Sequence, residues 1–170
     1  ICQLRMQPVN EDRVERVAQY LANRPAADKR PRALLEIMCL PGLIPIMEVR
    51  GKSYFRRFLA QAINSPSTQF VSIVRERFDS GLRQVVPLMR EEVPHLPRTI
   101  ADRRIATMIR TSSYLSAHHE ARCEKLPWSS GKIELETETR LMIDGLVGFL
   151  QAAHTVTEAT QKQPSDKIWA

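Results

Sequence analysis

The fold is decided by residues 133–153, which read IELETETRLMIDGLVGFLQAA. Two apolar stripes run along this stretch at the three- and four-residue spacing of an α-helix. One stripe comprises Leu135, Thr139, Met142, Leu146, Phe149 and Ala153, and the other comprises Ile143, Val147 and Leu150. A helix that is apolar over so wide an arc needs neighbours on two sides. It is therefore either the central helix of a monomer or a helix shared between two copies of the chain.

Two glycines within this helix favour the shared arrangement. Gly145 and Gly148 lie among its apolar residues, and a glycine inside a helix costs up to about 1 kcal/mol relative to alanine. Close approach of a second helix would offset that cost. We therefore expect a dimer interface on this helix, formed by Met142, Gly145, Leu146, Phe149 and Leu150.

The rest of the chain is also predicted to be helical. Only 6 of the 170 residues are glycine, and most of the 11 prolines fall where periodic segments begin or end, which favours an all-α bundle. We expect about six helices, with Asn10 capping the first, at residues 10–23, 31–40, 53–63, 66–93, 100–123 and 133–153. Residues 127–132 are predicted to form a loop. A domain at 1–155 would be followed by a flexible tail at 156–170.

The composition argues against several classes of protein. The net charge of +6 is interleaved with acidic residues, which is more typical of a solvated helical surface than of a nucleic-acid groove. The longest apolar stretch, residues 37–47, is broken by two prolines and is roughly half of a membrane span, so no membrane partner is expected. The three cysteines are widely spaced and fit a reducing, cytoplasmic location.

No catalytic centre is expected. The sequence contains no phosphate-binding loop, dinucleotide fingerprint, nucleophile elbow or HExxH motif. His118, His119 and Cys123 are candidate metal ligands, but only His119 and Cys123 share a helix face, and a zinc site needs three or four ligands. Glu91 and Glu92 are more typical of surface charges than of a catalytic pair. We therefore predict no catalytic residues, no metal and no cofactor.

Methionines and phenylalanines are frequent on the predicted inner helix faces. Methionine fills irregular gaps, so such faces suit either a solid core or the wall of a cavity. If three helices converge around a cavity, apolar walls with two polar groups would orient a small ligand. The residues predicted to bind it are Phe58, Phe78, Leu82, Met108, Ser112 and His119.

Several sequence blocks occur in an informative order. They are Arg5-x-x-Pro8-Val9-Asn10-x-x-Arg13, the segment from Gly51 through Tyr54-Phe55-Arg56-Arg57-Phe58-Leu59-Ala60-Gln61-Ala62, the long helix ending at Pro94-His95-Leu96-Pro97, Ala101-x-Arg103, and Ile143-Asp144-Gly145-Leu146. Their order and spacing resemble the effector domain of TetR-type transcriptional regulators over about residues 1–154.

This resemblance implies a bacterial, ligand-responsive regulator, generally a repressor. The family's helix-turn-helix would precede Ile1 and is missing from this chain, so operator DNA would be bound through that domain, with residues 1 to about 7 ending the linking helix. The chain would form a homodimer in which the last two long helices of each subunit build a four-helix bundle. A small, largely apolar effector would bind among the preceding helices.

Two other functions remain open at this stage. The chain could be a helical protein–protein adaptor with a solid core, which a cavity of roughly 300 Å³ or more would argue against. An all-helical enzyme is the weakest alternative because no catalytic constellation is visible.

Overall fold

The computed structural model describes residues 2–43, 46, 49–50, 52–64 and 80–155. Within these residues every regular element is helical, which confirms the predicted all-α fold with two long closing helices. The elements described are α1 (Cys2–Ala22), η1 (Ala27–Lys29), α2 (Arg30–Cys39), η2 (Leu40–Gly42), α4 (Phe55–Asn64), α6 (Ser80–Glu91), α7 (Arg98–Lys125) and α8 (Trp128–Gln151), where η denotes a 3-10 helix.

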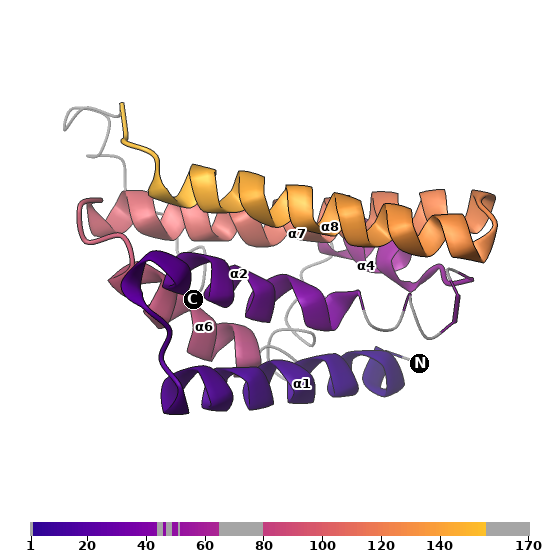
Figure 1. Ribbon diagram of the computed structural model, residues 1–170, viewed down its shortest axis with the longest axis horizontal. Coiled ribbons are helices and arrows are strands. Elements are labelled where there is room, and N and C mark those ends of the chain that lie inside the picture. Colours follow the sequence, from indigo (N-terminus) through magenta and orange to yellow (C-terminus); the bar gives the residue numbers. More distant parts are fainter. Residues whose placement is uncertain (1, 44–45, 47–48, 51, 65–79, 156–170) are drawn as a thin grey trace.

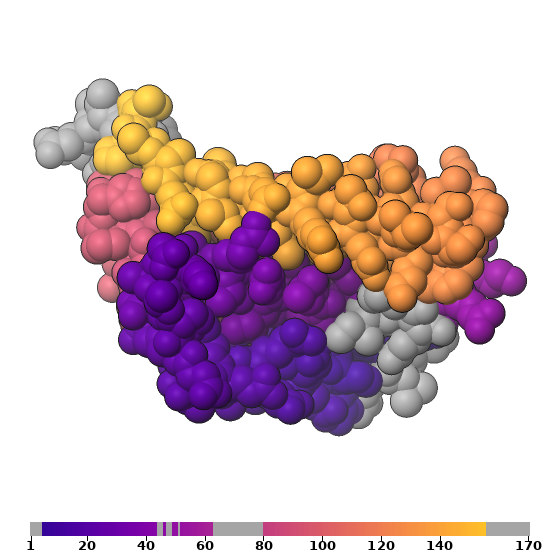
Figure 2. Space-filling model, in the orientation of Figure 1, coloured from indigo at the N-terminus to yellow at the C-terminus, as the bar shows by residue number. Residues whose placement is uncertain are grey.

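The two long helices lie along one edge of the molecule. In Figure 1, α7 and α8 run side by side, and α1 lies at the opposite edge. Between these edges, α2 contacts both α8 and α6, whereas α4 packs against α7 and α6 packs against α1. The space-filling view in Figure 2 shows α8 as a continuous exposed ridge above α2. One flank of α8 is therefore buried and another faces solvent.

A single large apolar core joins α1, α2, α6, α7 and α8. Its fully buried side chains include Val85, Met89, Ile105, Met108 and Leu150. Burying each of these side chains contributes about 1.5–3 kcal/mol. A smaller cluster contains Leu43, Ile46, Cys123 and Leu135.

The connection between α7 and α8 is shorter than the sequence predicted. Helix α8 begins at Trp128 instead of Ile133, so the predicted loop at 127–132 is wrong. Pro127 occupies the N-cap position, and the first turn follows at once because Gly131 N donates to the Pro127 carbonyl at 2.9 Å. Gly131 is buried beside the backbone of Cys123, where the small residue serves packing between the helices instead of a turn.

The predicted role of Asn10 is also wrong. Helix α1 is continuous from Cys2 to Ala22 and contains Pro8, so Asn10 lies inside it and caps nothing locally. The Asn10 side chain reaches α6 instead: its Oδ1 accepts from Gly81 N at 2.9 Å, and its Nδ2 donates to Ser80 Oγ at 2.8 Å. The first amides of a helix have no partner within it. Asn10, which belongs to α1, therefore supplies the partner that the Gly81 amide of α6 would otherwise lack.

A close approach of backbone and side chain accompanies this contact. A Cβ atom at Gly81 would lie 2.9 Å from Cβ and Cγ of Arg13 and 3.0 Å from its Cδ. Real Cβ atoms do not come that close to a neighbour, so glycine at this position lets α6 pack directly on the stem of Arg13.

We predict that Asn10→Ala lowers the free energy of unfolding by about 1–2 kcal/mol, because the Gly81 amide and the Ser80 hydroxyl lose their partner. Urea denaturation of the two proteins measures the difference. Asn23→Ala is the control, since Asn23 is exposed and makes one long hydrogen bond of 3.4 Å to its own helix. Equal stability of the two variants would show that the α1–α6 contact contributes nothing.

Candidate functional site

An apolar groove runs between α7 and α8 on the outer side of the pair. Its volume is about 380 Å³. Thr107, Thr111 and Leu115 of α7 line it, together with Leu141, Met142, Gly145, Leu146 and Phe149 of α8. Two of the apolar side chains are unusually accessible: Leu141 is 59% exposed and Phe149 is 42% exposed. The guanidinium of Arg104 lies 5.7 Å from the centre of the Phe149 ring.

The two glycines of α8 border open space. A Cβ atom at Gly145 or Gly148 would meet no atom within 4 Å, other than the helix's own backbone and chain neighbours. Nothing described within this chain therefore requires glycine at either position. The predicted interface residues are divided between surface and core. Phe149 and Gly145 are exposed, Met142 and Leu146 form the floor of the groove, and Leu150 is completely buried in the chain's own core.

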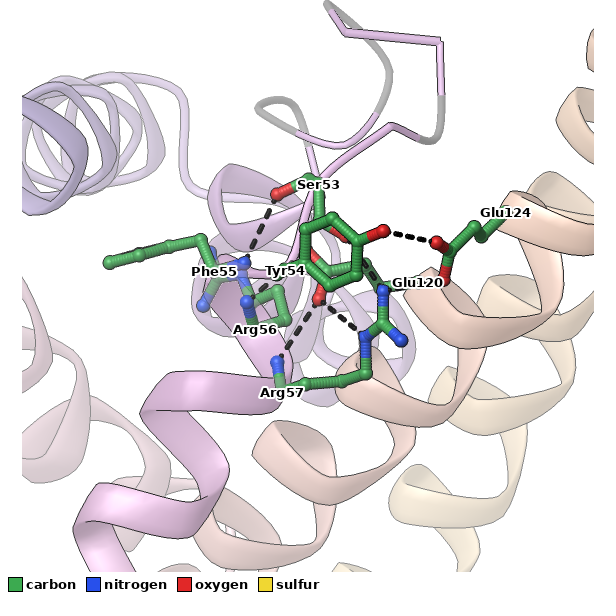
Figure 3. Close-up of polar contacts among 7 residues, drawn as sticks. All are labelled: Ser53, Tyr54, Phe55, Arg56, Arg57, Glu120 and Glu124. Atoms are coloured by element: carbon green, nitrogen blue, oxygen red, sulfur yellow. Dashed lines mark hydrogen bonds and ion pairs between the residues drawn. The ribbon is translucent and has the colours of Figure 1, made fainter.

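A second cluster, which is polar, joins the start of α4 to α7. Figure 3 shows the carboxylate of Glu120, which is fully buried, facing the first turn of α4. Glu120 accepts from Arg56 N at 3.2 Å and from Arg57 N at 3.1 Å. Ser53 Oγ accepts from Phe55 N at 3.2 Å. These side chains satisfy the amides that have no partner within the helix, and the negative charge also suits the positive end of the helix dipole.

Three side chains that are more exposed, Tyr54, Arg57 and Glu124, contact one another outside the capping contacts of Glu120 and Ser53. Arg57 Nη2 lies 2.8 Å from Glu124 Oε2, and the Arg57 guanidinium lies 4.3 Å from the centre of the Tyr54 ring. The Tyr54 hydroxyl donates to Glu124 Oε1 (Figure 3). The hydrogen bond from Tyr54, and then that from Arg57, lower the pKa of Glu124. Helix α7 thus contacts α4 through two carboxylates, the buried Glu120 and the exposed Glu124.

Two arginines are buried beside this cap. Arg13 of α1 is 7% exposed and Arg56 of α4 is 8% exposed. Arg13 Nη2 donates to the carbonyl of Met38 at 3.1 Å. Burial, followed by repulsion from Arg13, lowers the pKa of Arg56 to about 10. Burial likewise raises the pKa of the nearby Cys39 thiol to about 12, which leaves it protonated and unreactive.

The residues predicted to bind an effector come from three helices. Met108 is fully buried in the main core and Leu82 is packed against that core. Ser112 and His119 are buried on the same side of α7, where Ser112 Oγ donates to the Ile109 carbonyl at 2.9 Å. Phe58 is 49% exposed, so its ring does not face the interior as predicted. Phe78 lies outside the described residues.

His119 has one ring nitrogen without a partner. Its Nδ1 is buried and makes no hydrogen bond, and its Nε2 lies 3.8 Å from Glu138 Oε2. Burial lowers the pKa of His119, which outweighs the opposing effect of the Glu138 carboxylate. The imidazole is therefore neutral at pH 7, and its unpaired Nδ1 can donate or accept one hydrogen bond with a ligand.

Metal and membrane sites find no support in the part of the chain that the structure describes. No three His, Cys, Asp or Glu residues within it are grouped to hold a metal ion. None of its helices has the length and apolar character needed to cross a bilayer.

The buried charged residues Arg13, Arg56 and Glu120 were not predicted as site residues. A signal for two of them exists in the sequence: Arg13 lies four residues from Val9 and Val17, and Glu120 lies three residues from Cys123, so each falls on the buried face of its helix. A charged residue on such a face points to a polar contact inside the bundle.

Comparison with known proteins identifies one family. Residues 44–153 match the family model described as tetracyclin repressor-like, C-terminal domain. This range includes α4, α6, α7 and α8. No curated protein and no solved structure matches the chain.

We predict that Glu120→Gln destabilises the fold by about 2 kcal/mol, because a neutral amide accepts less strongly and turns a donor group towards one of the two amides. Chemical denaturation measures this change. Glu124→Gln, one turn along α7 at the exposed surface, is the matched control and is expected to leave stability nearly unchanged. Two variants of equal stability would mean that Glu120 does not hold α4 in place.

Proposed function

We propose, since the chain belongs to the family of tetracyclin repressor-like C-terminal domains, that it is the effector-sensing and dimerisation part of a TetR-type transcriptional repressor. The family match carries this proposal, because it spans the groove between α7 and α8 and most of the helices around the core. The family is not one of enzymes, in agreement with the absence of a catalytic motif from the sequence.

The partner that fits the α7–α8 groove best is a second copy of the chain. Exposed apolar side chains gathered on one surface usually mark an interface, and a two-fold axis would place the same groove on both subunits. Gly145 and Gly148 support this assignment, since each costs up to about 1 kcal/mol in the helix and nothing described in the chain offsets it. The backbone of a second α8 could approach at these positions.

Effector binding would act on DNA through α1. This helix contacts α2, η2 and α6, so a ligand that separates those elements changes the orientation of α1. A helix-turn-helix domain joined to α1 in each subunit would then lose the spacing of about 34 Å that two operator half-sites require. Coupling of this kind is typically worth about 1–3 kcal/mol and acts equally in both directions.

We predict that the chain is a dimer at micromolar concentration and that Leu141→Arg raises the dimer dissociation constant at least ~100-fold. The added charge would be buried without a partner, at a cost of about 3 kcal/mol or more. Sedimentation velocity measures the change. Leu141 is suited to this test because it is exposed in the single chain, whereas Leu146 belongs to its core.

Two further variants separate dimerisation from folding. Ile133→Arg places the same charge at an exposed position of α8 that does not line the groove, and it is expected to remain a dimer. In Gly145→Leu the added Cβ meets no described atom within 4 Å in the single chain, and the position is exposed, so we expect this variant to fold normally and to dissociate. A monomeric unmodified chain, or a dimer unaffected by Leu141→Arg, would place the interface elsewhere.

We also predict that small apolar or amphipathic compounds stabilise the chain by binding near Met108. A saturating ligand at 100 times its dissociation constant contributes about 2.7 kcal/mol, which a thermal-shift assay detects easily. Met108→Ala is expected to weaken binding. Leu135→Ala, which removes a buried side chain from the separate smaller core cluster, should not. If no compound binds, the adaptor function becomes the better proposal.

A further inference from the structure

The guanidinium of Arg56 is buried without a hydrogen-bond partner on one edge. Its Nε and Nη2 are both inaccessible to solvent and both unpaired, while the residue as a whole is 8% exposed. No carboxylate of the described residues lies within ion-pair distance of it. A native interior rarely contains such a group, because an unpaired buried charge is among the costliest features a fold can carry.

The surroundings of Arg56 add positive charge. Arg13 of α1 repels it, and among the described residues Glu120 is the one carboxylate that influences its pKa. That carboxylate is already engaged, since it accepts from the amides of Arg56 and Arg57 and lies 3.5 Å from the Arg57 guanidinium. The remaining titratable neighbour, the Cys39 thiol, is neutral. Among the described residues, no carboxylate is therefore left to pair with the Arg56 guanidinium.

The unpaired edge has a defined chemical complement. Nε–H and Nη2–H of an arginine point in the same direction and are spaced to donate to the two oxygens of one carboxylate. The corresponding amide or alcohol offers only one oxygen and brings no charge. The edge therefore favours an anion with two oxygens on one carbon over the corresponding amide or alcohol.

We propose that this edge of Arg56, with Arg13 beside it, binds the carboxylate of an amphipathic effector. The inference rests on the proposed sensing function and narrows the effector from a largely apolar compound to an organic acid with an apolar tail. Arg13 and Arg56 come from α1 and α4, so one carboxylate would join α1, through which the proposed function acts on DNA, to α4, which Glu120 caps.

The position of Gly42 explains how such a ligand would act. A Cβ atom at Gly42 would lie 2.5 Å from Nη2, 2.9 Å from Cζ and 3.1 Å from Nη1 of Arg56, so η2 packs directly against the guanidinium. A carboxylate that reaches Nη2 would therefore press on this backbone, and η2 contacts both α1 and α2. Binding would shift η2 and neutralise the charge of Arg56 at the same time.

The test uses matched pairs of acids and amides. Octanoate with octanamide, decanoate with decanamide, and benzoate with benzamide are titrated into the unmodified chain, and affinity is measured by calorimetry and thermal shift. We expect at least one acid to bind ten times more tightly than its amide. Arg56→Met is expected to remove this preference by weakening the acid at least tenfold, with little effect on the amide.

Two variants complete the design. Arg103→Met removes the same charge from the exposed surface of α7 and should leave the preference unchanged. Arg56→Lys keeps the charge but not the two-donor edge, and it provides a second, milder variant that is expected to lose most of the preference. Without ligand, Arg56→Met should melt at a higher temperature than the unmodified chain, whereas a guanidinium with a structural role would make it melt lower.

The outcomes distinguish this inference from the proposed function. If amides bind as tightly as acids, or if Arg56→Met and Arg56→Lys leave the preference intact, carboxylate recognition by Arg56 is wrong while effector sensing stands. If no acid or amide binds, and the wider thermal-shift screen also finds no compound that binds near Met108, the sensing function itself is wrong.

Discussion

The antiparallel contact between α7 and α8 is the constraint on which the other helices depend. A connection of only two residues, 126–127, forces the helices to turn back on each other, so their inner faces meet along their length. Helix α4 then packs on α7 and α2 packs on α8, and α1 and α6 close the core from the opposite side (Figure 1). The same pairing leaves apolar side chains, including Leu141 and Phe149, exposed on the outer side of the two helices. One contact therefore defines both the interior and the groove.

The position of α4 depends on polar contacts as well as on apolar burial, which involves Phe55, Leu59 and Ala60. A helix of 10 residues is too short to be stable alone in water. Two aromatic side chains at its start do not add to this burial: Tyr54, just before α4, is 64% exposed and Phe58 is 49% exposed. Glu120 and Ser53 compensate by satisfying its first amides, which ties α4 to α7 by directed hydrogen bonds. The arrangement fixes the end of α4 that carries Arg56.

Helical periodicity was sufficient to predict the class of fold and the buried side of α8, because side chains such as Leu135, Ile143 and Leu150 leave water only when they face the core. It was insufficient wherever a polar residue is satisfied at long range. Asn10 has the residue type of a local cap, yet its partners are 70 and 71 positions away. Gly131 has the residue type of a loop, yet it is buried in a helix. Arginines near apolar stripes usually extend into solvent, which hid Arg13 and Arg56.

The unbroken length of α1 has a mechanical consequence. A continuous helix tends to move as one body, and the direct contact of α6 with it at Arg13 and Gly81 is a natural centre for such a motion. The part of α1 from this centre to Cys2 is about 11 residues, or roughly 16 Å at ~1.5 Å per residue. A tilt of about 5° at this centre therefore moves the far end by about 1.4 Å, and anything attached beyond it by proportionally more. Pro8 lies between Arg13 and Cys2, and a proline inside a helix is a common site of bending. The segment before Pro8 can therefore bend relative to the rest of α1.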